Sequence, residues 1–587
     1  MFLKKGEFMH PYVTVILLTV AAILLLVTWI LYENRKQKKR MLRKIQRIYG
    51  KVPEREYAAG DLKNISHYFL RKKGDDFWID DITWNDLDMD RIYMLINQTV
   101  SSPGEDVLYD MLRRPVFRQE DIDRREKLIR FFAENKEKRE QMQILLSNVG
   151  KTWHGSLSDT ILALEEAPQV NTGLHWVMFA LLIVTLVGVL PFYPALGFLL
   201  FVLLSTVNVV YYYAGKDRQR IGAFLDCFSS FLCMLESAER METADWPEIS
   251  EQMEYIRKGK KALSGLKKRV FFLTGRNDTS GNPAQLFLDY IRMLFHVDIL
   301  IYNGTLKTVQ GKTQEIMLLL DNMGELDAVI SIASFRELLP LWCSPCFCEE
   351  KGKHIRLLAE DLYHPLIQEP VANTIETEGS VLVTGSNASG KSTFLKNVAI
   401  NSILAQTVLT CTCSHYEAPF LKVMTSMALR DDLSGGESYF IVEIRSLKRI
   451  LDESRKQEPL LCIIDEVLRG TNTIERIAAS SRILSALNRD WILPFAATHD
   501  IELSYILDRQ YRNYHFEEEV QEHEVLFHYL LKKGRATSRN AIKLLSMLEY
   551  DPVIVKGAEE AAADFEQTGV WKPVSYTHLT LPTTPYV

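Results

Sequence analysis

The sequence predicts an α-helical core domain that is interrupted by a transmembrane hairpin, preceded by a transmembrane anchor and followed by an α/β domain of the P-loop type. Three observations support this fold class. Two long segments without charged residues lie before residue 214. Apolar residues recur at helical spacing up to about residue 340. From His354 onward, short apolar strands alternate with helices, which is typical of an α/β domain.

The composition limits the class of protein. The chain has 587 residues, of which 47% are hydrophobic and 25% are charged, so a globular protein with two or three domains is expected. The net charge of −6 excludes a general attraction to nucleic acid, and any such binding must come from a local patch. The eight cysteines form no regular framework, which favours reduced thiols in a reducing compartment.

The first uncharged segment, Tyr12 to Tyr32, is long enough as a helix to span a hydrocarbon core of about 30 Å. A cleaved signal peptide is the alternative, but its apolar region would be shorter and would end in small residues. The basic stretch Arg35 to Arg47 follows the segment, whereas only Lys4 and Lys5 precede it. The positive-inside rule therefore places the amino terminus outside and the body of the chain in the cytoplasm.

The second uncharged segment, Trp176 to Tyr213, is broken near its middle by Pro191 and Pro194. Its length fits two short spans joined by a turn, with aromatic residues at both ends. The alternative is a hairpin inside a soluble core, but such helices normally carry a polar face. We therefore expect three spans in a multi-pass protein of the cell membrane, with the soluble parts in the cytoplasm.

The rest of the amino-terminal half reads as helix, most clearly in the amphipathic stretches Asp121 to Leu146 and Gln285 to Leu338. The predicted organisation is an anchor with its basic flank at 1–50, the first part of the helical core at 51–170, the hairpin at 171–215, the second part of the core at 216–345, the α/β domain at 346–572, and a non-native tail at 573–587.

The α/β domain is organised around Val381 to Thr393, where an apolar run leads into a glycine-rich loop and a helix. The stretch fits G-x-x-x-x-G-K-[ST], with Gly385, Gly390, Lys391 and Ser392 in the fixed positions. Glycines let backbone N–H groups close around phosphate oxygens, the lysine reaches the terminal phosphates, and the serine hydroxyl binds Mg²⁺. The motif predicts a site for ATP and Mg²⁺; a glycine-rich turn without a ligand is the alternative.

Three further motifs follow the loop. The apolar run from Leu460 ends in Asp465, placed to hold Mg²⁺, and Glu466, placed to polarise the attacking water. His499 is placed to sense the γ-phosphate. Asp431 to Phe440, which lies after the loop and before the acidic pair, contains the LSGGE string. ABC-type ATPases place this string against the nucleotide of a partner subunit. The ordered set predicts an ATPase of the ABC type, with Glu466 and His499 as its catalytic residues.

Beyond these motifs, the sequence resembles the MutS family of DNA mismatch-repair ATPases. The phosphate loop, with Asn387 inside it and Thr393 at its end, is similar to the version in that family, and so is Asp465 to Arg476. Leu530 to Ala558 resembles the closing segment of the family, and Trp84 to Val116 resembles the start of its helical core. The resemblance covers most of the chain from Trp84 onward, with the apolar hairpin as an interruption.

The resemblance implies a homodimer with two composite ATP sites. Each site would combine the phosphate loop and the acidic pair of one subunit with Ser434, Gly435, Gly436 and Ser438 of the other, and Ser438 would be the serine that reaches the partner. The implied function is ATP-dependent DNA binding of the mismatch-repair type. The alternative is a MutS-like or ABC-type ATPase that acts in a membrane process without recognising mismatches.

The expected DNA contact is Arg257 to Arg276, a stretch with eight basic residues and no acidic one. It could bind the phosphates of DNA or anionic lipid headgroups, or be a solvated helix face. Few residues precede the helical core, so we do not expect the mismatch-reading domain of the family. Any DNA binding should therefore not select mismatches, because that choice needs contacts to base edges or wedges in the stack.

Overall fold

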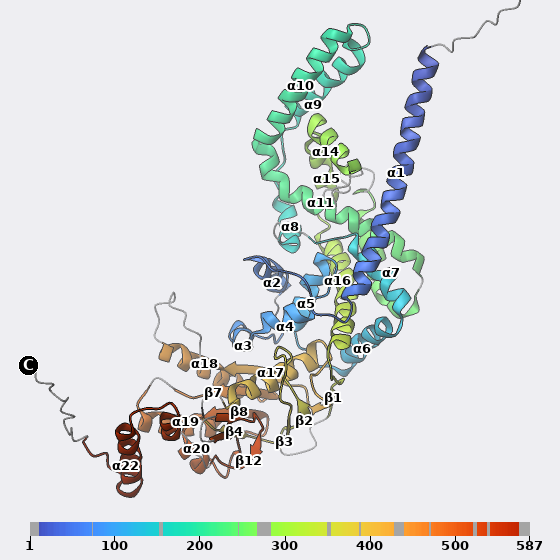
Figure 1. Ribbon diagram of the computed structural model, residues 1–587. Coiled ribbons are helices and arrows are strands. Elements are labelled where there is room, and N and C mark those ends of the chain that lie inside the picture. Colours follow the sequence, from blue (N-terminus) through green and yellow to red (C-terminus); the bar gives the residue numbers. More distant parts are fainter. Residues whose placement is uncertain are drawn as a thin grey trace, which may run out of the picture. The chain divides into compact units, whose positions relative to one another are not determined.

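The structure, a computed structural model, separates into two compact units, drawn with their elements labelled in Figure 1. The first unit comprises Met1–Pro345 and Asn401–Thr412, and the second comprises Cys346–Ile400 and Cys413–Val587. The residues that the structure describes are 11–72, 74, 76–151, 156–244, 246–266, 283–348, 354–386, 389–427, 439–468, 471–520, 525–536 and 541–573.

The first unit is helical up to the end of α16. Its helices are α1 (Pro11–Ile48), α2 (Asp61–Lys72), α3 (Asp81–Asp86), α4 (Met89–Ile96), α5 (Ser102–Arg113), α6 (Gln119–Glu134), α7 (Lys136–Ser147), α8 (Leu157–Leu162), α9 (Gly173–Val184), α10 (Pro194–Ala214), α11 (Lys216–Met241), α12 (Ser250–Leu263), α14 (Pro283–Phe295), α15 (Val297–Val309) and α16 (Thr313–Leu338).

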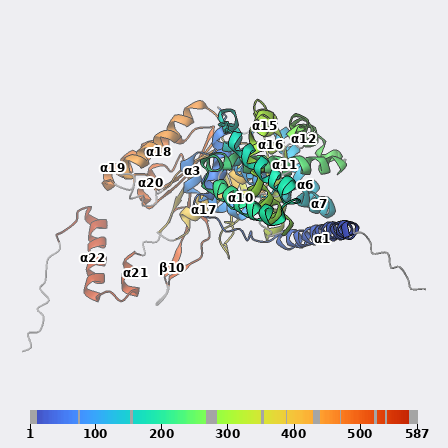
Figure 2. The same cartoon turned by 90° about the horizontal axis from the view of Figure 1, so that it is seen from above.

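Helix α16 forms the centre of the core of this unit. From Ile316 to Arg336 most of its residues are buried, and α5, α6 and α12 pack against it. Figure 2 shows α6 and α12 close to α16, which agrees with these contacts. At Gly324 a Cβ atom would come within 2.4 Å of the Pro103 carbonyl oxygen, so a glycine allows α5 and α16 to approach closely.

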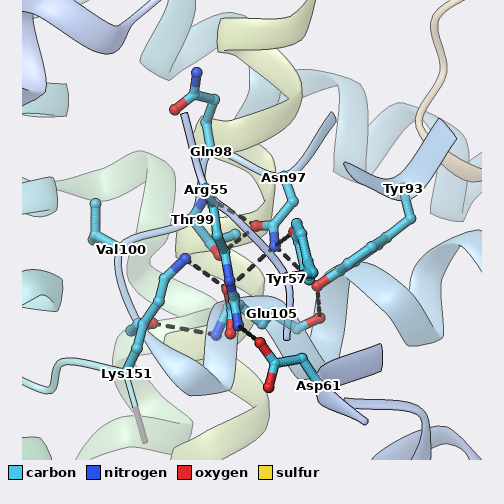
Figure 3. Close-up of polar contacts among 12 residues, drawn as sticks. Arg55, Tyr57, Asp61, Tyr93, Asn97, Gln98, Thr99, Val100, Glu105 and Lys151 are labelled. Atoms are coloured by element: carbon cyan, nitrogen blue, oxygen red, sulfur yellow. Dashed lines mark hydrogen bonds and ion pairs between the residues drawn. The ribbon is translucent and has the colours of Figure 1, made fainter. Parts of the chain in front are cut away.

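A buried polar cluster ties the segment after α1 to α5 and α16 (Figure 3). The Glu105 carboxylate accepts hydrogen bonds from Lys151 at 2.6 Å and from Asn97 at 3.2 Å, and it forms an ion pair with Arg55. On α16, Asp327 accepts from the backbone N–H of Ser101 at 2.9 Å and so fixes the residue that caps α5. Buried charges are thus paired, as their desolvation requires.

Two long predicted helices are broken in the structure. Asp121 to Leu146 is divided between α6 and α7 at Asn135, whose side chain donates to the Phe131 carbonyl at 2.8 Å and so competes with the helical backbone bonds. Gln285 to Leu338 is divided among α14, α15 and α16, because His296 adopts a φ of 51° and Gly311 a φ of 74°. Helical periodicity predicted the helical content correctly but not these breaks.

The uncharged segment Trp176 to Tyr213 forms a helical hairpin. Helix α9 continues into a π-helical turn, Thr185–Val189, and after a short connection α10 returns beside it (Figure 1). A Cβ atom on Gly197 would come within 2.4 Å of the Leu190 Cα atom, so the two arms approach closely where the chain reverses. Large apolar side chains are exposed along both arms, among them Trp176, Val187, Phe198 and Leu203.

By length and composition, two helices in the described part of the chain could cross a membrane, Pro194–Ala214 and Arg220–Ala244. The second is mostly buried, as expected for a core helix. The other arm of the hairpin, Gly173–Val189, is apolar but shorter. The predicted first span lies inside α1. This criterion does not support the three spans that we expected.

The second unit contains mixed sheets with helices. Its six-stranded sheet has the order β12-β9-β4-β8-β7-β6, with all neighbours parallel except β12 and β9. A four-stranded sheet has the order β1-β5-β2-β3, and β10 and β11 form a separate antiparallel pair. The strands are β1 (Cys346–Phe347), β2 (Arg356–Leu362), β3 (Asn373–Glu378), β4 (Val381–Thr384), β5 (His415–Ala418), β6 (Lys422–Ser426), β7 (Leu460–Asp465), β8 (Ile492–Thr498), β9 (Arg512–His515), β10 (Glu518–Val520), β11 (Val525–Phe527) and β12 (Lys532–Lys533).

The central strands β4, β7 and β8 are buried along their whole length, which explains their nearly continuous apolar sequences. Leu382, Ile464 and Ala496 belong to one hydrophobic cluster of this sheet. The helices that begin in this part are α17 (Lys391–Thr407), which belongs to the first unit from Asn401 onward, α18 (Tyr439–Glu453), α19 (Thr473–Leu487), α20 (Ile501–Ile506), α21 (Ala541–Met547) and α22 (Pro552–Thr568). A mainly helical chain that continues into mixed sheets agrees with the predicted order, and the nucleotide-binding character of the α/β part stays a prediction.

Candidate functional site

Three predicted motifs meet at the carboxyl edge of the six-stranded sheet. In the parallel register, Thr384 pairs with Thr498 and Asp465 pairs with Ala497. Strands β4, β7 and β8 therefore end side by side, and each is followed by a predicted site residue: Gly385, Glu466 and His499, respectively. Open parallel sheets bind ligands at this edge, outside the carboxyl ends of their strands.

The loop between β4 and α17 depends on its two glycines. Gly385 has a φ of 148°, and a Cβ atom there would come within 2.8 Å of the Phe516 carbonyl oxygen. Gly390 has a φ of 105°, and a Cβ atom there would come within 3.1 Å of the Tyr529 ring. Helix α17 begins at the next residue, so its free N–H groups face the loop.

Lys391 is the first residue of α17, and it is only 4% exposed. Its Nζ atom donates to the carbonyl oxygens of Gly385 at 2.8 Å and Ser386 at 2.6 Å. A buried ammonium group needs such partners. The loop therefore holds the cation through its own backbone, in a position where an incoming anion could compete for it.

A cavity of about 600 Å³ opens over this loop. Six predicted residues line it: Gly390, Lys391, Ser392, Thr393, Asp465 and Glu466. Gly385 and His499 lie just outside its lining and contact each other, with His499 Nδ1 at 3.0 Å from the Gly385 carbonyl oxygen. The volume is within the range of small-molecule sites.

The acidic pair occupies the end of β7. Asp465 is 9% exposed, whereas Glu466 has left the strand with a φ of 60°. The Glu466 backbone N–H donates to the Ala497 carbonyl at 3.0 Å, which fixes this turn against β8. A positive φ in a residue other than glycine is uncommon and often marks a functional position.

The Glu466 side chain forms an ion pair with Nε2 of His499, while Nδ1 of the same ring faces the Gly385 carbonyl. A carbonyl oxygen can only accept, so Nδ1 carries a hydrogen. The imidazole ring thus bridges the Glu466 carboxyl group and the loop carbonyl beside the cavity.

An ion pair that was not predicted supports this corner. Arg476, near the start of α19, donates to both carboxylate oxygens of Asp500, at 2.9 and 2.6 Å. Asp500 follows His499 directly, so this bidentate pair connects the segment after the acidic pair to the end of β8. Arg476 is the last residue of Asp465 to Arg476, the segment that resembles the MutS family. The sequence alone did not indicate that Arg476 pairs with Asp500.

The cavity wall also includes residues that the motifs did not indicate. His364, Val371 and Asn373 come from β3 and the loop before it, and Phe516 and Tyr529 come from segments that follow β9 and β11. Asn373 fixes the last of these segments, because its Nδ2 donates to the Tyr529 carbonyl at 3.0 Å and its Oδ1 accepts from the Leu531 N–H at 2.7 Å. Short stretches such as the one around Val371 carry no spacing rule that would have indicated a ligand.

Other predicted residues lie outside the described part of the chain: Asn387 in the loop, and Ser434, Gly435, Gly436 and Ser438 in the LSGGE string. The basic stretch is described only up to its fourth basic residue, on α12. There, Lys258 pairs with Glu254 at 2.8 Å and Lys260 with Glu242 at 2.5 Å. Carboxylates from outside the stretch thus balance part of its charge.

Comparison with known proteins identifies the family. The family model described as MutS domain V matches residues 381–566, which include the loop, the acidic pair and His499. These residues belong to the MutS family.

Curated relatives include the DNA mismatch repair protein MutS of Thermus thermophilus, which is 30% identical over 212 residues, or 35% of this chain and 26% of the relative. The DNA mismatch repair protein MutS of Bacillus velezensis is 30% identical over 263 residues, or 42% of this chain and 29% of the relative. The matches thus span less than a third of the length of these relatives. The family model covers the loop, the acidic pair and His499, whereas His364, Val371 and Asn373 of the cavity wall lie before it.

Proposed function

We propose that this MutS-family chain is a membrane-anchored ATPase that binds ATP with Mg²⁺ in the cavity and hydrolyses it to ADP and phosphate. The observation that carries the proposal is the convergence of the glycine-rich loop, Asp465, Glu466 and His499 at one sheet edge. The family membership supports the same function. Each part of the site has a role that its chemistry suits.

The loop and Lys391 would hold the phosphates. The first N–H groups of α17 and the ammonium of Lys391 supply positive charge at the floor of the cavity. Lys391 donates to neutral carbonyl oxygens of the loop, and a triphosphate oxygen is a stronger acceptor than these. Binding would therefore exchange bonds to neutral acceptors for stronger bonds to an anionic acceptor.

Ser392 and Asp465 would hold the metal ion. Both line the cavity, and a hydroxyl with a carboxylate offers the oxygen ligands that Mg²⁺ prefers. The ion, when bound, neutralises charge on the phosphates. The oxygen donors at this wall of the cavity thus fit Mg²⁺ rather than a metal that requires nitrogen or sulfur ligands.

Glu466 would orient the attacking water and accept its proton, with His499 as its partner. The contact between these side chains holds the carboxylate toward the loop, where the terminal phosphate would lie. His499 would then report the presence of that phosphate, because its ring contacts both Glu466 and the loop. The chain would supply both binding and water positioning from one sheet edge.

A homodimer with composite sites and DNA binding complete the proposal. The relatives are named for DNA mismatch repair, which supports DNA as a partner. Contacts through Arg257 to Arg276 would reach phosphates and not bases, so matched and mismatched duplexes should bind alike.

The exposed apolar hairpin α9–α10 supports insertion into the cell membrane with the ATPase part in the cytoplasm. It also favours the second candidate function, an ATPase acting in a membrane process without DNA.

The test is the ATPase rate of the detergent-solubilised chain with and without matched, mismatched and branched DNA. Stimulation by DNA, equal for matched and mismatched duplexes, is expected for the first candidate. If DNA binds through the basic stretch, neutralising Lys260, Lys261, Lys267 and Lys268 should reduce the slope of log K against the logarithm of salt concentration by up to about 3.6. ATP turnover that DNA does not change would favour the second candidate, and no turnover would reject both.

A further inference from the structure

Glu518 lies directly behind the phosphate loop and has no role in the site described above. It begins β10, is 8% exposed, and accepts a hydrogen bond from the Ser386 hydroxyl. Ser386 lines the cavity, but Glu518 does not. A carboxylate in this position touches the loop without facing the space for a nucleotide.

The contact acts on the residue that holds Lys391. The Ser386 carbonyl oxygen accepts from Lys391 Nζ at 2.6 Å and from the Ser389 hydroxyl at 2.9 Å. Fixing the Ser386 side chain therefore also fixes the carbonyl that orients the ammonium group. Glu518 thus reaches Lys391 through one intervening residue.

The chain direction explains why Glu518 points to the loop. β9 runs parallel to β4, and the Phe516 N–H continues that pairing by donating to the Thr384 carbonyl at 3.0 Å. Side chains alternate along an extended segment. Phe516 and Glu518 contact the loop, whereas Glu517 turns away to His515 at 2.6 Å and Lys532 at 2.7 Å.

We propose that Glu518 is a positioning residue of the phosphate loop, which holds Ser386 so that the loop is preorganised for the triphosphate. This inference rests on the proposed ATP-binding function. A loop that is ordered before binding loses less conformational freedom when the ligand arrives. Glu518 should therefore influence nucleotide affinity far more than the rate of the chemical step.

The test is the dissociation constant of a fluorescent ATP analogue with Mg²⁺, measured on the full-length solubilised chain. Glu518→Ala should weaken binding by about tenfold, as expected for the loss of a hydrogen bond to a charged group, while kcat at saturating ATP changes little. Glu518→Gln keeps an oxygen acceptor and should restore affinity to within about threefold of the unmodified chain. Glu517→Ala, which removes the neighbouring carboxylate from the other face, is the matched control and should bind normally.

A double-mutant cycle with Ser386→Ala isolates the contact. Ser386→Ala should weaken binding like Glu518→Ala, and the double variant should be no weaker than the weaker single variant. Normal affinity of Glu518→Ala, multiplicative effects in the cycle, or failure of Glu518→Gln to restore affinity would each overturn the inference. Absence of binding by the unmodified chain would instead contradict the proposed function itself.

Discussion

Single residues at the candidate site were predictable where a fixed spacing demands one residue type. Gly385, Gly390 and Lys391 are such cases, because the loop needs positive φ values at the glycines and a cation at the start of the helix. The pairing of Glu466 with His499 was not predictable. It depends on the register of β7 against β8, which places residues distant in sequence side by side.

The buried cluster around Glu105 gives a prediction at the same scale. Glu105→Gln removes the carboxylate partner of Lys151 and leaves Arg55 with only Asp61 at 3.7 Å, which should destabilise the fold by about 3 kcal/mol. Chemical unfolding of the solubilised chain measures this. Glu251→Gln, at a solvent-exposed pair with Arg124, is the control and should cost less than about 1 kcal/mol.

The destabilisation by Glu105→Gln should also depend on pH. Burial, and then the charge of Arg55, lower the pKa of Lys151. A lysine whose pKa is lowered in the folded chain opposes folding most at a pH below that folded pKa, because the folded chain must then bury the charge. As the pH rises from the folded pKa toward the unfolded pKa, the folded lysine loses its proton and this cost decreases. The effect of the substitution should therefore differ between pH 6 and pH 9 and be larger at pH 6, where Lys151 must stay charged without its partner. An equal effect at both values would show that Lys151 does not bear the unpaired charge.

Among the elements, periodicity identified helices and buried strands but not where helices end. The break between α14 and α15 shows the reason. His296 keeps its positive φ while its ring contacts the Asn208 carbonyl at 2.9 Å and His175 at 2.8 Å, both from the hairpin side of the fold. Such tertiary bonds are invisible to a pattern read along one segment.

The hairpin α9–α10 gives the prediction at this scale. A cysteine at Tyr193, whose side chain is 67% exposed at the turn, should react with a membrane-impermeant maleimide added outside intact cells. The native Cys346, also exposed, should react only after the membrane is opened, and serves as the internal control. Labelling of Tyr193→Cys only after opening would mean that the hairpin does not cross the membrane.

The whole molecule is proposed to work as a dimer with two composite sites. Mixing Lys391→Ala subunits with Ser438→Ala subunits should leave one composite site intact in each mixed dimer, because the two defects fall in the same site. Partial ATPase activity in the mixture, absent from both parents, is expected. A mixture as inactive as its parents would favour sites within one chain or strict coupling between the two sites.

The central claim is that the cavity at the sheet edge binds and hydrolyses ATP, and one measurement tests it most directly: ATP binding and ATP turnover compared in the unmodified chain, Lys391→Ala and Glu466→Gln. Lys391→Ala removes the buried cation and should abolish tight binding. Glu466→Gln keeps the phosphate and Mg²⁺ contacts, so it should bind ATP normally and turn over at least about a hundredfold more slowly. Normal turnover by Glu466→Gln, or unchanged binding by Lys391→Ala, would contradict the account.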